Sequence, residues 1–166
     1  MEKKTLIILV GNIGCGKSTM TKYYVDKGYV AIARDQLRYA IGGGKYIFDY
    51  EYEPIIWKTE LYMFRKFVEL GENIVIDEVG LNKLMRGRYI PYAKENGYWI
   101  RVIQFPKFTM KESVDRRLRN PHGQFDRKEW NGIWKKFNKC YERPNRDEGI
   151  DEIIKLRKKQ LNGEES

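Results

Sequence analysis

A glycine-rich segment at residues 11–18 has the residue types and the spacing that phosphate binding requires. It reads Gly11-Asn-Ile-Gly-Cys-Gly-Lys-Ser18 and matches the pattern G-x-x-x-x-G-K-[ST]. Its glycines let backbone amides turn inward around a phosphate, Lys17 supplies positive charge, and the Ser18 hydroxyl can bind Mg²⁺. Cys15 is interpreted as a small residue that fits the loop rather than as a redox switch. We predict that ATP is bound by Gly11, Asn12, Ile13, Gly14, Cys15, Gly16, Lys17, Ser18 and Thr19.

Two acids, Asp77 and Glu78, follow the apolar run at residues 74–76. An acid at the end of a buried strand can hold the Mg²⁺ of a P-loop enzyme, through water or through the hydroxyl of Ser18. The alternative is that Asp77 caps a helix that begins near Leu81. Because the phosphate loop is present, we favour the metal-linked role.

Asp35 and Arg38 stand three residues apart at the start of a predicted helix and therefore share one helix face. A carboxylate at this place can accept the proton of an attacking hydroxyl, and Arg38 could hold a phosphate of the acceptor. Spacing alone favours the plainer alternative, a salt bridge between two neighbours on a helix.

Strands that alternate with helices must position these residues. Apolar, β-branched runs predict strands at 5–10, 29–33, 73–77, 98–105 and, more weakly, 150–156. The stretches between them predict helices at 17–27, 34–41, 53–70, 81–95, 110–119 and 127–141. Such alternation implies parallel strands with crossover helices. The sequence thus predicts an α/β, three-layer fold with a roughly five-stranded parallel sheet.

The chain of 166 residues fits one domain, which we place at 1–158, followed by a tail at 159–166. No apolar run approaches the ~20 residues that span a bilayer, and residues 1–10 do not read as a signal peptide. Two cysteines give no disulfide framework, so we expect a cytoplasmic protein without a membrane partner. A single histidine, His122, argues against His-based triads and multi-His metal sites.

The charge is positive and unevenly distributed. The chain has 32 Lys and Arg against 23 Asp and Glu, a net charge of +9. Residues 107–146 hold 12 basic and 5 acidic side chains, whereas residues 45–78 hold 4 basic and 8 acidic ones. A net positive charge favours a polyanionic partner, which is nucleic acid or a nucleotide phosphate.

Aromatic residues gather in two places. The stretch 46–57 is rich in rings, on which nucleotide bases could stack for ~1–3 kcal/mol each, although packing among the protein's own rings is an equal alternative. The second group forms one helical stripe that we predict to be core: Trp130, Trp134, Phe137 and Tyr141.

Taken together, the segments GNIGCGKST, ARDQLR, IVIDE and RPNRDEGIDEIIKL resemble the kinase domain of 5′-hydroxyl polynucleotide kinases over about residues 6–156. The resemblance implies an ATP- and Mg²⁺-dependent phosphotransferase in which Asp35 is the general base on the acceptor hydroxyl. Arg38 would bind the acceptor phosphate, with Arg34 beside it. Lys17 and Ser18 would hold the donor phosphates and Mg²⁺, with Asp77 in support.

The same family carries an arginine in a mobile lid that closes on the ATP phosphates. The candidates here are Arg116, Arg117 and Arg119, in a lid that we place at about 116–126, where Asn120-Pro-His-Gly123 breaks a helix. We favour Arg119 for the charge of the transition state and Arg116 second. The alternative is a solvated helix face or a phosphate-binding patch without a catalytic part.

The sequence departs from that family directly after Asp77. Polynucleotide kinases usually continue with Thr and Asn, whereas this chain continues with Glu78-Val79-Gly80. Glu78 adds a second carboxylate near the acceptor, so it could contact the substrate and share or replace the base role of Asp35.

We therefore predict a kinase that transfers the γ-phosphate of ATP to a hydroxyl of DNA or RNA, most simply a 5′-OH end. One alternative acceptor is the hydroxymethyl group of a modified pyrimidine such as 5-hydroxymethyluracil within DNA, which some phage enzymes of this superfamily phosphorylate. Another is a nucleoside or other small molecule. A nucleotide-dependent switch is less favoured, because it needs neither Asp35 and Arg38 nor an arginine lid.

Overall fold

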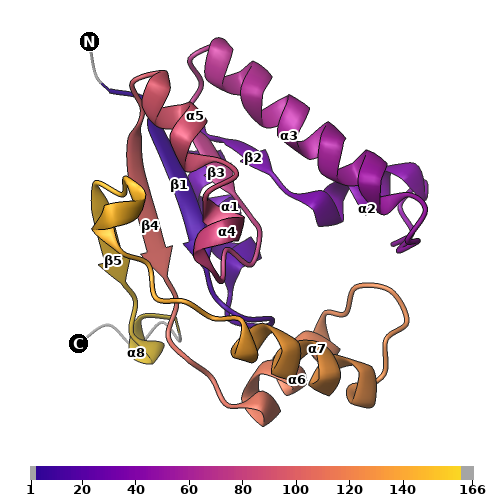
Figure 1. Cartoon of the computed structure of the whole chain (residues 1–166). Helices are drawn as coiled ribbons and strands as arrows, with labels where there is room; N and C mark the ends of the chain where they lie inside the picture. The colour runs from indigo at the N-terminus through magenta and orange to yellow at the C-terminus, as the bar shows by residue number, and fades with distance from the viewer. Residues whose placement is uncertain (1–2, 162–166) are drawn as a thin grey trace.

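Five parallel strands form one sheet in the order β2-β3-β1-β4-β5 in the computed structural model, which describes residues 3–161. The strands are β1 (Thr5–Val10), β2 (Val30–Ile32), β3 (Ile74–Ile76), β4 (Trp99–Gln104) and β5 (Glu152–Lys155). The helices between and after them are α1 (Lys17–Asp26), α2 (Arg34–Ile41), α3 (Glu53–Glu69), α4 (Lys83–Arg86), α5 (Ile90–Glu95), α6 (Met110–Arg119), α7 (Arg127–Lys139) and α8 (Lys158–Leu161). A 3-10 turn, η1 (Arg146–Glu148), precedes β5. The predicted α/β fold with a five-stranded parallel sheet is confirmed (Figure 1).

The central strand β1 is buried on both faces, which explains its unbroken apolar sequence. On one face, Leu6 and Ile8 pack in a core cluster that includes Phe64 of α3 and Ile90 of α5. On the other face, Ile7 belongs to a second cluster that α1 and α8 help to cover. The two clusters are the two interfaces of a three-layer sandwich, and they fix the register of β1 in the sheet.

A pair of helices, α6 and α7, pack against each other beside the sheet rather than on one of its faces (Figure 1). Their shared cluster is centred on Val114 of α6 and Trp130 of α7, together with Ile13 from the loop after β1. The predicted stripe on α7 is therefore core in part: Trp130 is buried, while Trp134 and Phe137 are half-buried and pack at the rim of this cluster.

The predicted helix over 81–95 is wrong, because the segment forms two short helices, α4 and α5. Pro91 lies in the first turn of α5. Within one continuous helix its ring would clash with the carbonyl group of Gly87 and would remove a hydrogen bond, so the chain breaks before it. The other predicted elements lie within a few residues of their observed bounds.

The helix α8 contains the first residues of the predicted tail. Lys158 pairs with Glu112 of α6 at 3.0 Å, and Leu161 packs against the cluster around Ile7. Residues 162–166 lie outside the described part of the chain. Within residues 3–161, no helix combines the length and the apolar character needed to cross a bilayer.

The fully buried side chain of Arg86 ties α4 to η1. It donates to both carboxylate oxygens of Glu148 at 2.7 Å and to the carbonyl oxygens of Gly80 and Glu142 at 2.8 and 3.1 Å. Burial acts to raise the pKa of Glu148, but the hydrogen bonds from Arg86 and the Asn145 backbone outweigh it and hold the pKa below its ordinary value.

We predict that Arg86→Met lowers the free energy of unfolding by about 3–5 kcal/mol, because it leaves the Glu148 carboxylate buried without its partner. Chemical denaturation measures this loss. The matched control is Arg101→Gln, which breaks a half-exposed ion pair with Glu152 and is expected to cost less than about 1 kcal/mol. Similar losses in the two variants would contradict this account of the Arg86 site.

Candidate active site

The loop between β1 and α1 is shaped to hold an anion. Gly14 and Gly16 have φ angles of 66° and 104°, in the left-handed region that glycine adopts without strain. The α1 N-terminus has no side-chain cap and no acid in its first turn, so its N–H groups are available to a phosphate. The buried Lys17 donates through Nζ to the carbonyl oxygens of Gly11 and Asn12, both at 2.9 Å. This is the geometry of a nucleotide-binding P-loop.

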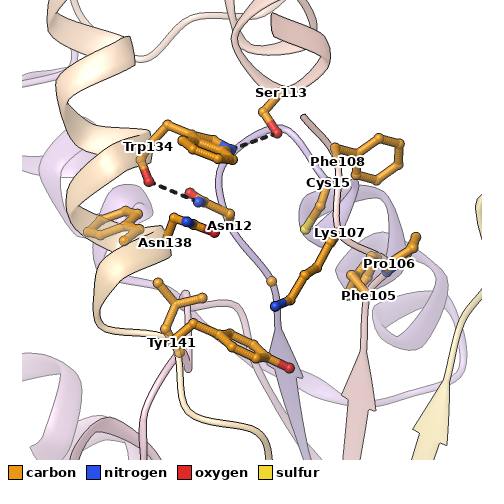
Figure 2. A pocket seen from close by; sticks show the side chains of 13 residues that line it. Asn12, Cys15, Phe105, Pro106, Lys107, Phe108, Ser113, Trp134, Asn138 and Tyr141 are labelled. Atoms are coloured by element: carbon orange, nitrogen blue, oxygen red, sulfur yellow. Dashed lines mark hydrogen bonds between the residues drawn. The ribbon is translucent and has the colours of Figure 1, made fainter. Parts of the chain in front are cut away.

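The outer side of this loop is held by α6 and α7. Figure 2 shows the Asn12 side chain donating to the Trp134 carbonyl oxygen at 3.1 Å and the Trp134 indole donating to the Ser113 hydroxyl at 3.2 Å. The same view shows a small hollow between the loop, the end of β4 and α7, into which Lys107 extends towards the ring of Tyr141. Cys15 is buried at the edge of this hollow.

The two predicted metal ligands lie on neighbouring elements. Ser18 is exposed in the first turn of α1, and Asp77 directly follows β3, the strand that pairs with β1. The Asp77 backbone N–H donates to the Ile32 carbonyl oxygen at 2.8 Å, which aligns the end of β3 with the end of β2. A hydroxyl and a carboxylate are the oxygen donors that Mg²⁺ prefers alongside phosphate oxygens, so the pair fits this ion.

Asp35 lies in the first turn of α2 and is surrounded by donors from three segments. Its Oδ1 accepts hydrogen bonds from Arg38 Nη1 at 2.7 Å and from the Tyr46 hydroxyl at 2.9 Å. Its Oδ2 lies 3.5 Å from Nε2 of His122. Desolvation acts to raise the pKa of Asp35, but the charges of His122 and Arg38 and the hydrogen bonds outweigh it and hold the pKa below its ordinary value. The carboxylate is therefore ionised at neutral pH.

Arg38, predicted to bind an acceptor phosphate, is engaged by two carboxylates. Besides Asp35, it donates through Nε and Nη2 to the two oxygens of Glu53, at 2.9 and 2.7 Å. Its guanidinium also lies over the rings of Tyr46 and Phe48. An incoming phosphate would have to compete with Glu53 for this guanidinium.

Glu78 holds the start of α2. Its Oε1 accepts a hydrogen bond from the Arg34 backbone N–H at 2.7 Å, and its Oε2 accepts one from Arg34 Nη2 at 2.5 Å. This carboxylate thus supplies the cap that the α2 N-terminus lacks from its own side chains. The Arg34 guanidinium stacks at 3.7 Å on the ring of Trp57, over which the guanidinium of Arg88 also lies.

The three candidate lid arginines differ in position. Arg116 lies beside the phosphate loop, because a Cβ built on Gly14 would be 3.4 Å from the Cβ of Arg116. The guanidinium of Arg117 lies 5.2 Å above the ring of Trp130, whereas Arg119 is exposed at the C-terminal end of α6. Within residues 3–161, buried nitrogen atoms of Arg116 and Arg117 have no hydrogen-bond partner.

The structure thus brings the phosphate loop, Asp77 and Asp35 to the same edge of the sheet. Helices α6 and α7 border the phosphate loop, and the loop between these helices borders Asp35 through His122. Sequence reasoning missed three residues that contact Asp35 or its partner: Tyr46, Glu53 and His122. His122 offered one signal, since it is the only histidine of the chain and lies in the predicted lid. Nothing in the spacing of Tyr46 or Glu53 pointed to Asp35.

Residues 6–140 match the AAA domain family. The chain belongs to this family. The matched region spans the phosphate loop, Asp35, Asp77 and the predicted lid at 116–126. No curated protein sequence matches the chain.

Solved structures of several kinases share this P-loop kinase fold. A putative kinase from Chloroflexus aurantiacus has a TM-score of 0.68 at 12% identity, with 99% of this chain and 91% of that chain covered. A shikimate kinase from Acinetobacter baumannii, solved with shikimate, has a TM-score of 0.57 at 17% identity, with 95% and 86% covered.

A chain of the Pnkp1/Rnl/Hen1 RNA repair complex is also similar, with a TM-score of 0.58 at 18% identity and 84% of this chain covered. The aligned part makes up 46% of the length of that chain. These likenesses show a kinase-like P-loop fold.

We predict that Gly14→Ala weakens nucleotide binding by at least tenfold. A Cβ at this position would lie 2.3 Å from the Ser113 carbonyl oxygen, and alanine would be strained at the positive φ, so α6 must move away from the loop. Titration with a fluorescent ATP analogue measures the affinity.

The matched control is Gly132→Ala in α7, where a Cβ has no neighbour within 4 Å. This variant should bind nucleotide normally and should gain about 0.5–1 kcal/mol of stability from helix propensity. Normal binding by Gly14→Ala would show that the contact between α6 and the loop is dispensable.

Proposed function

We propose that the protein is an ATP-dependent phosphotransferase that phosphorylates a hydroxyl of nucleic acid, most simply a 5′-OH end. The observation that carries the proposal is that α6 and the loop after it, which contain the predicted lid, border both halves of such a site. Ser113 and Arg116 of α6 lie against Gly14 of the phosphate loop, and His122 of the loop after α6 lies beside Asp35. A switch that only binds nucleotide does not need an ionised carboxylate such as Asp35 in contact with its lid.

In this proposal Asp35 receives the proton of the attacking hydroxyl. Its Oδ1 is held by Arg38 and Tyr46, so the carboxylate has a fixed orientation, and Oδ2 remains for the acceptor. Transfer of a phosphoryl group depends mostly on alignment and on charge stabilisation, which the loop and the lid supply. Lys17 would leave the carbonyl oxygens of its own loop and bind the donor phosphates.

Mg²⁺, when bound between Ser18, Asp77 and the nucleotide, would neutralise charge on the β- and γ-phosphates. The position of Arg116 beside Gly14, with a buried nitrogen atom that has no partner in the described chain, supports it as the first candidate for contact with the γ-phosphate. Arg117 is the second candidate. Arg119, favoured from the sequence, lies at the exposed end of α6 and would need a larger movement.

Nucleic acid is supported as the acceptor by the charge of α7, which packs against the phosphate loop. Four exposed lysines lie on this helix, and none forms an ion pair within residues 3–161: Lys128, Lys135, Lys136 and Lys139. Such an unneutralised row attracts a polyanion. The likeness to a chain of an RNA repair complex supports the same acceptor class, whereas the likeness to shikimate kinase leaves small alcohols as the competing class.

Transfer of label from γ-labelled ATP to a panel of acceptors tests the proposal. The panel contains a 5′-OH DNA oligomer, its RNA equivalent, a 5′-phosphorylated oligomer, DNA with 5-hydroxymethyluracil and blocked ends, nucleosides, and shikimate as a small alcohol. We expect label on the 5′-OH oligomers. Label only on the blocked, modified DNA would move the reaction to internal bases. Label only on small molecules would overturn nucleic acid as the acceptor. No label on any acceptor, with ATP still bound, would overturn the proposed kinase activity.

We predict that Asp35→Asn lowers kcat by about 10²–10⁴-fold, the usual contribution of a general base, and changes the Kd for ATP by less than about twofold. Single-turnover transfer and ATP titration measure the two quantities. The control is Asp147→Asn, at an exposed acid of η1, which should behave like the unmodified protein. Normal turnover by Asp35→Asn would discard Asp35 as the base and point to Glu78.

A further inference from the structure

His122 of the lid lies against the acceptor side of the site and has no part in the chemistry proposed above. Nδ1 of His122 lies 2.8 Å from the Tyr39 hydroxyl, and its ring stacks on Tyr46 with a centroid distance of 5.3 Å and an angle of 19°. The neighbouring Gly123 has a φ of 64°, and a Cβ there would be 3.1 Å from the Tyr46 ring. The backbone of the lid loop thus packs directly against Tyr46, and the imidazole lies in the proposed acceptor site.

The partners of the two ring nitrogens decide which nitrogen of the neutral imidazole carries the proton. The ionised carboxylate of Asp35 can only accept a hydrogen bond, so the ring nitrogen that faces it carries the proton, and the Tyr39 hydroxyl can donate its own proton to Nδ1. Nε2 is the atom 3.5 Å from Asp35 Oδ2. The N–H group therefore faces the carboxylate oxygen that neither Arg38 nor Tyr46 holds.

A hydrogen-bond acceptor, Asp35 Oδ2, and a hydrogen-bond donor, the Nε2–H of His122, therefore lie next to each other. A hydroxyl oxygen within hydrogen-bonding distance of both would donate its proton to the carboxylate and accept the imidazole hydrogen on a lone pair. An ammonium group has no lone pair for the second bond. The pair is complementary to an alcohol.

We propose that His122 is a positioning residue that completes the acceptor site when the lid is closed, by orienting Asp35 and the attacking hydroxyl through Nε2–H. The inference rests on the proposed function, because it places the hydroxyl at Asp35. It assigns the lid a second task besides delivering arginines to the phosphates.

The charged and titratable groups around the imidazole come from every segment that faces it. They are Asp35, Arg38 and Tyr39 of α2, Tyr46 of the following loop, Asp77 after β3, and Arg117 of α6. Burial lowers the pKa of His122 below its ordinary value, and the charge of Asp35 opposes this effect without cancelling it. The ring is therefore neutral at pH 7, the state in which the contacts with Asp35 and Tyr39 together favour one tautomer.

Because the chain has a single histidine, NMR reads this site without assignment. Long-range ¹H–¹⁵N spectra of tag-free protein should show the Nε2–H tautomer at pH 7 and a His122 pKa below about 6.5. Tyr39→Phe should weaken the preference for this tautomer, because Nδ1 loses its hydrogen-bond donor. Asp35→Asn should lower the His122 pKa further, because the nearby negative charge is gone. A pKa near 6.5 with mixed tautomers, unmoved by both variants, would overturn the placement of His122.

Kinetics test the positioning role. We expect His122→Ala to lower kcat/KM for the acceptor about tenfold, with KM for ATP within twofold, since one hydrogen bond to a charged group is lost. The acid limb of the pH profile should move to higher pH, because Asp35 loses a partner that lowers its pKa. His122→Gln, which keeps an N–H donor, should recover part of the loss. Gln124→Ala, at an exposed residue of the same loop, is the control.

The outcomes separate the two proposals. Equal losses of kcat/KM in His122→Ala and His122→Gln, together with weaker ATP binding, would mean that His122 only maintains the structure of the lid. An unchanged kcat/KM in both variants would also overturn the positioning role. If the unmodified protein labels no hydroxyl at all, the proposed function fails. The NMR experiment then still decides whether His122 is held by Tyr39 and Asp35.

Discussion

Parallel strand pairing is the constraint on which the remainder of this molecule depends. Strands β2, β3 and β1 are adjacent and run in the same direction, so their carboxyl ends meet at one edge of the sheet. Asp35 follows β2, Asp77 follows β3 and the phosphate loop follows β1. Three segments far apart in the sequence thus become neighbours without any loop that reaches across the molecule, which is the usual place for a ligand in an open α/β sheet.

The charged side chains that gather at this edge are stabilised by partners from other elements. Glu78 neutralises Arg34 and caps α2, and Glu53 neutralises Arg38. Trp57 and Phe48 lie over the two guanidiniums, so these rings of the aromatic stretch at 46–57 pack against arginines, whereas Tyr50 and Tyr52 are exposed. Asp35 is the exception, because only one of its oxygens is held firmly. Two nitrogen atoms of Arg34, Nε and Nη1, also lack a partner within residues 3–161, but Asp35 Oδ2 is the atom of this network that can accept the proton of a hydroxyl.

The features that could be predicted from the sequence are those that depend on residues close together in the chain. The phosphate loop and the bounds of α2 could be predicted, since apolar runs, glycines and helix periodicity act within a few residues of each other. The break before Pro91 is also local, because it follows from the missing N–H and the ring of that one residue. Arg38 could be predicted as a partner of Asp35 from their spacing, and the structure has this ion pair. Tyr46 and His122 could not, because they reach Asp35 only after two loops distant in the sequence have packed. The same holds for Glu78, whose hydrogen bonds connect residues 44 positions apart.

The central claim is that one lid joins the donor site to the acceptor site, and thermodynamic linkage tests it most directly. The measurement is the Kd of a non-hydrolysable ATP analogue with and without the acceptor that takes up label. If closure over the phosphates also completes the acceptor site, each ligand should tighten the other by at least fivefold, and by the same factor in both directions. Equal Kd values with and without acceptor would contradict the account, because the two sites would then close independently.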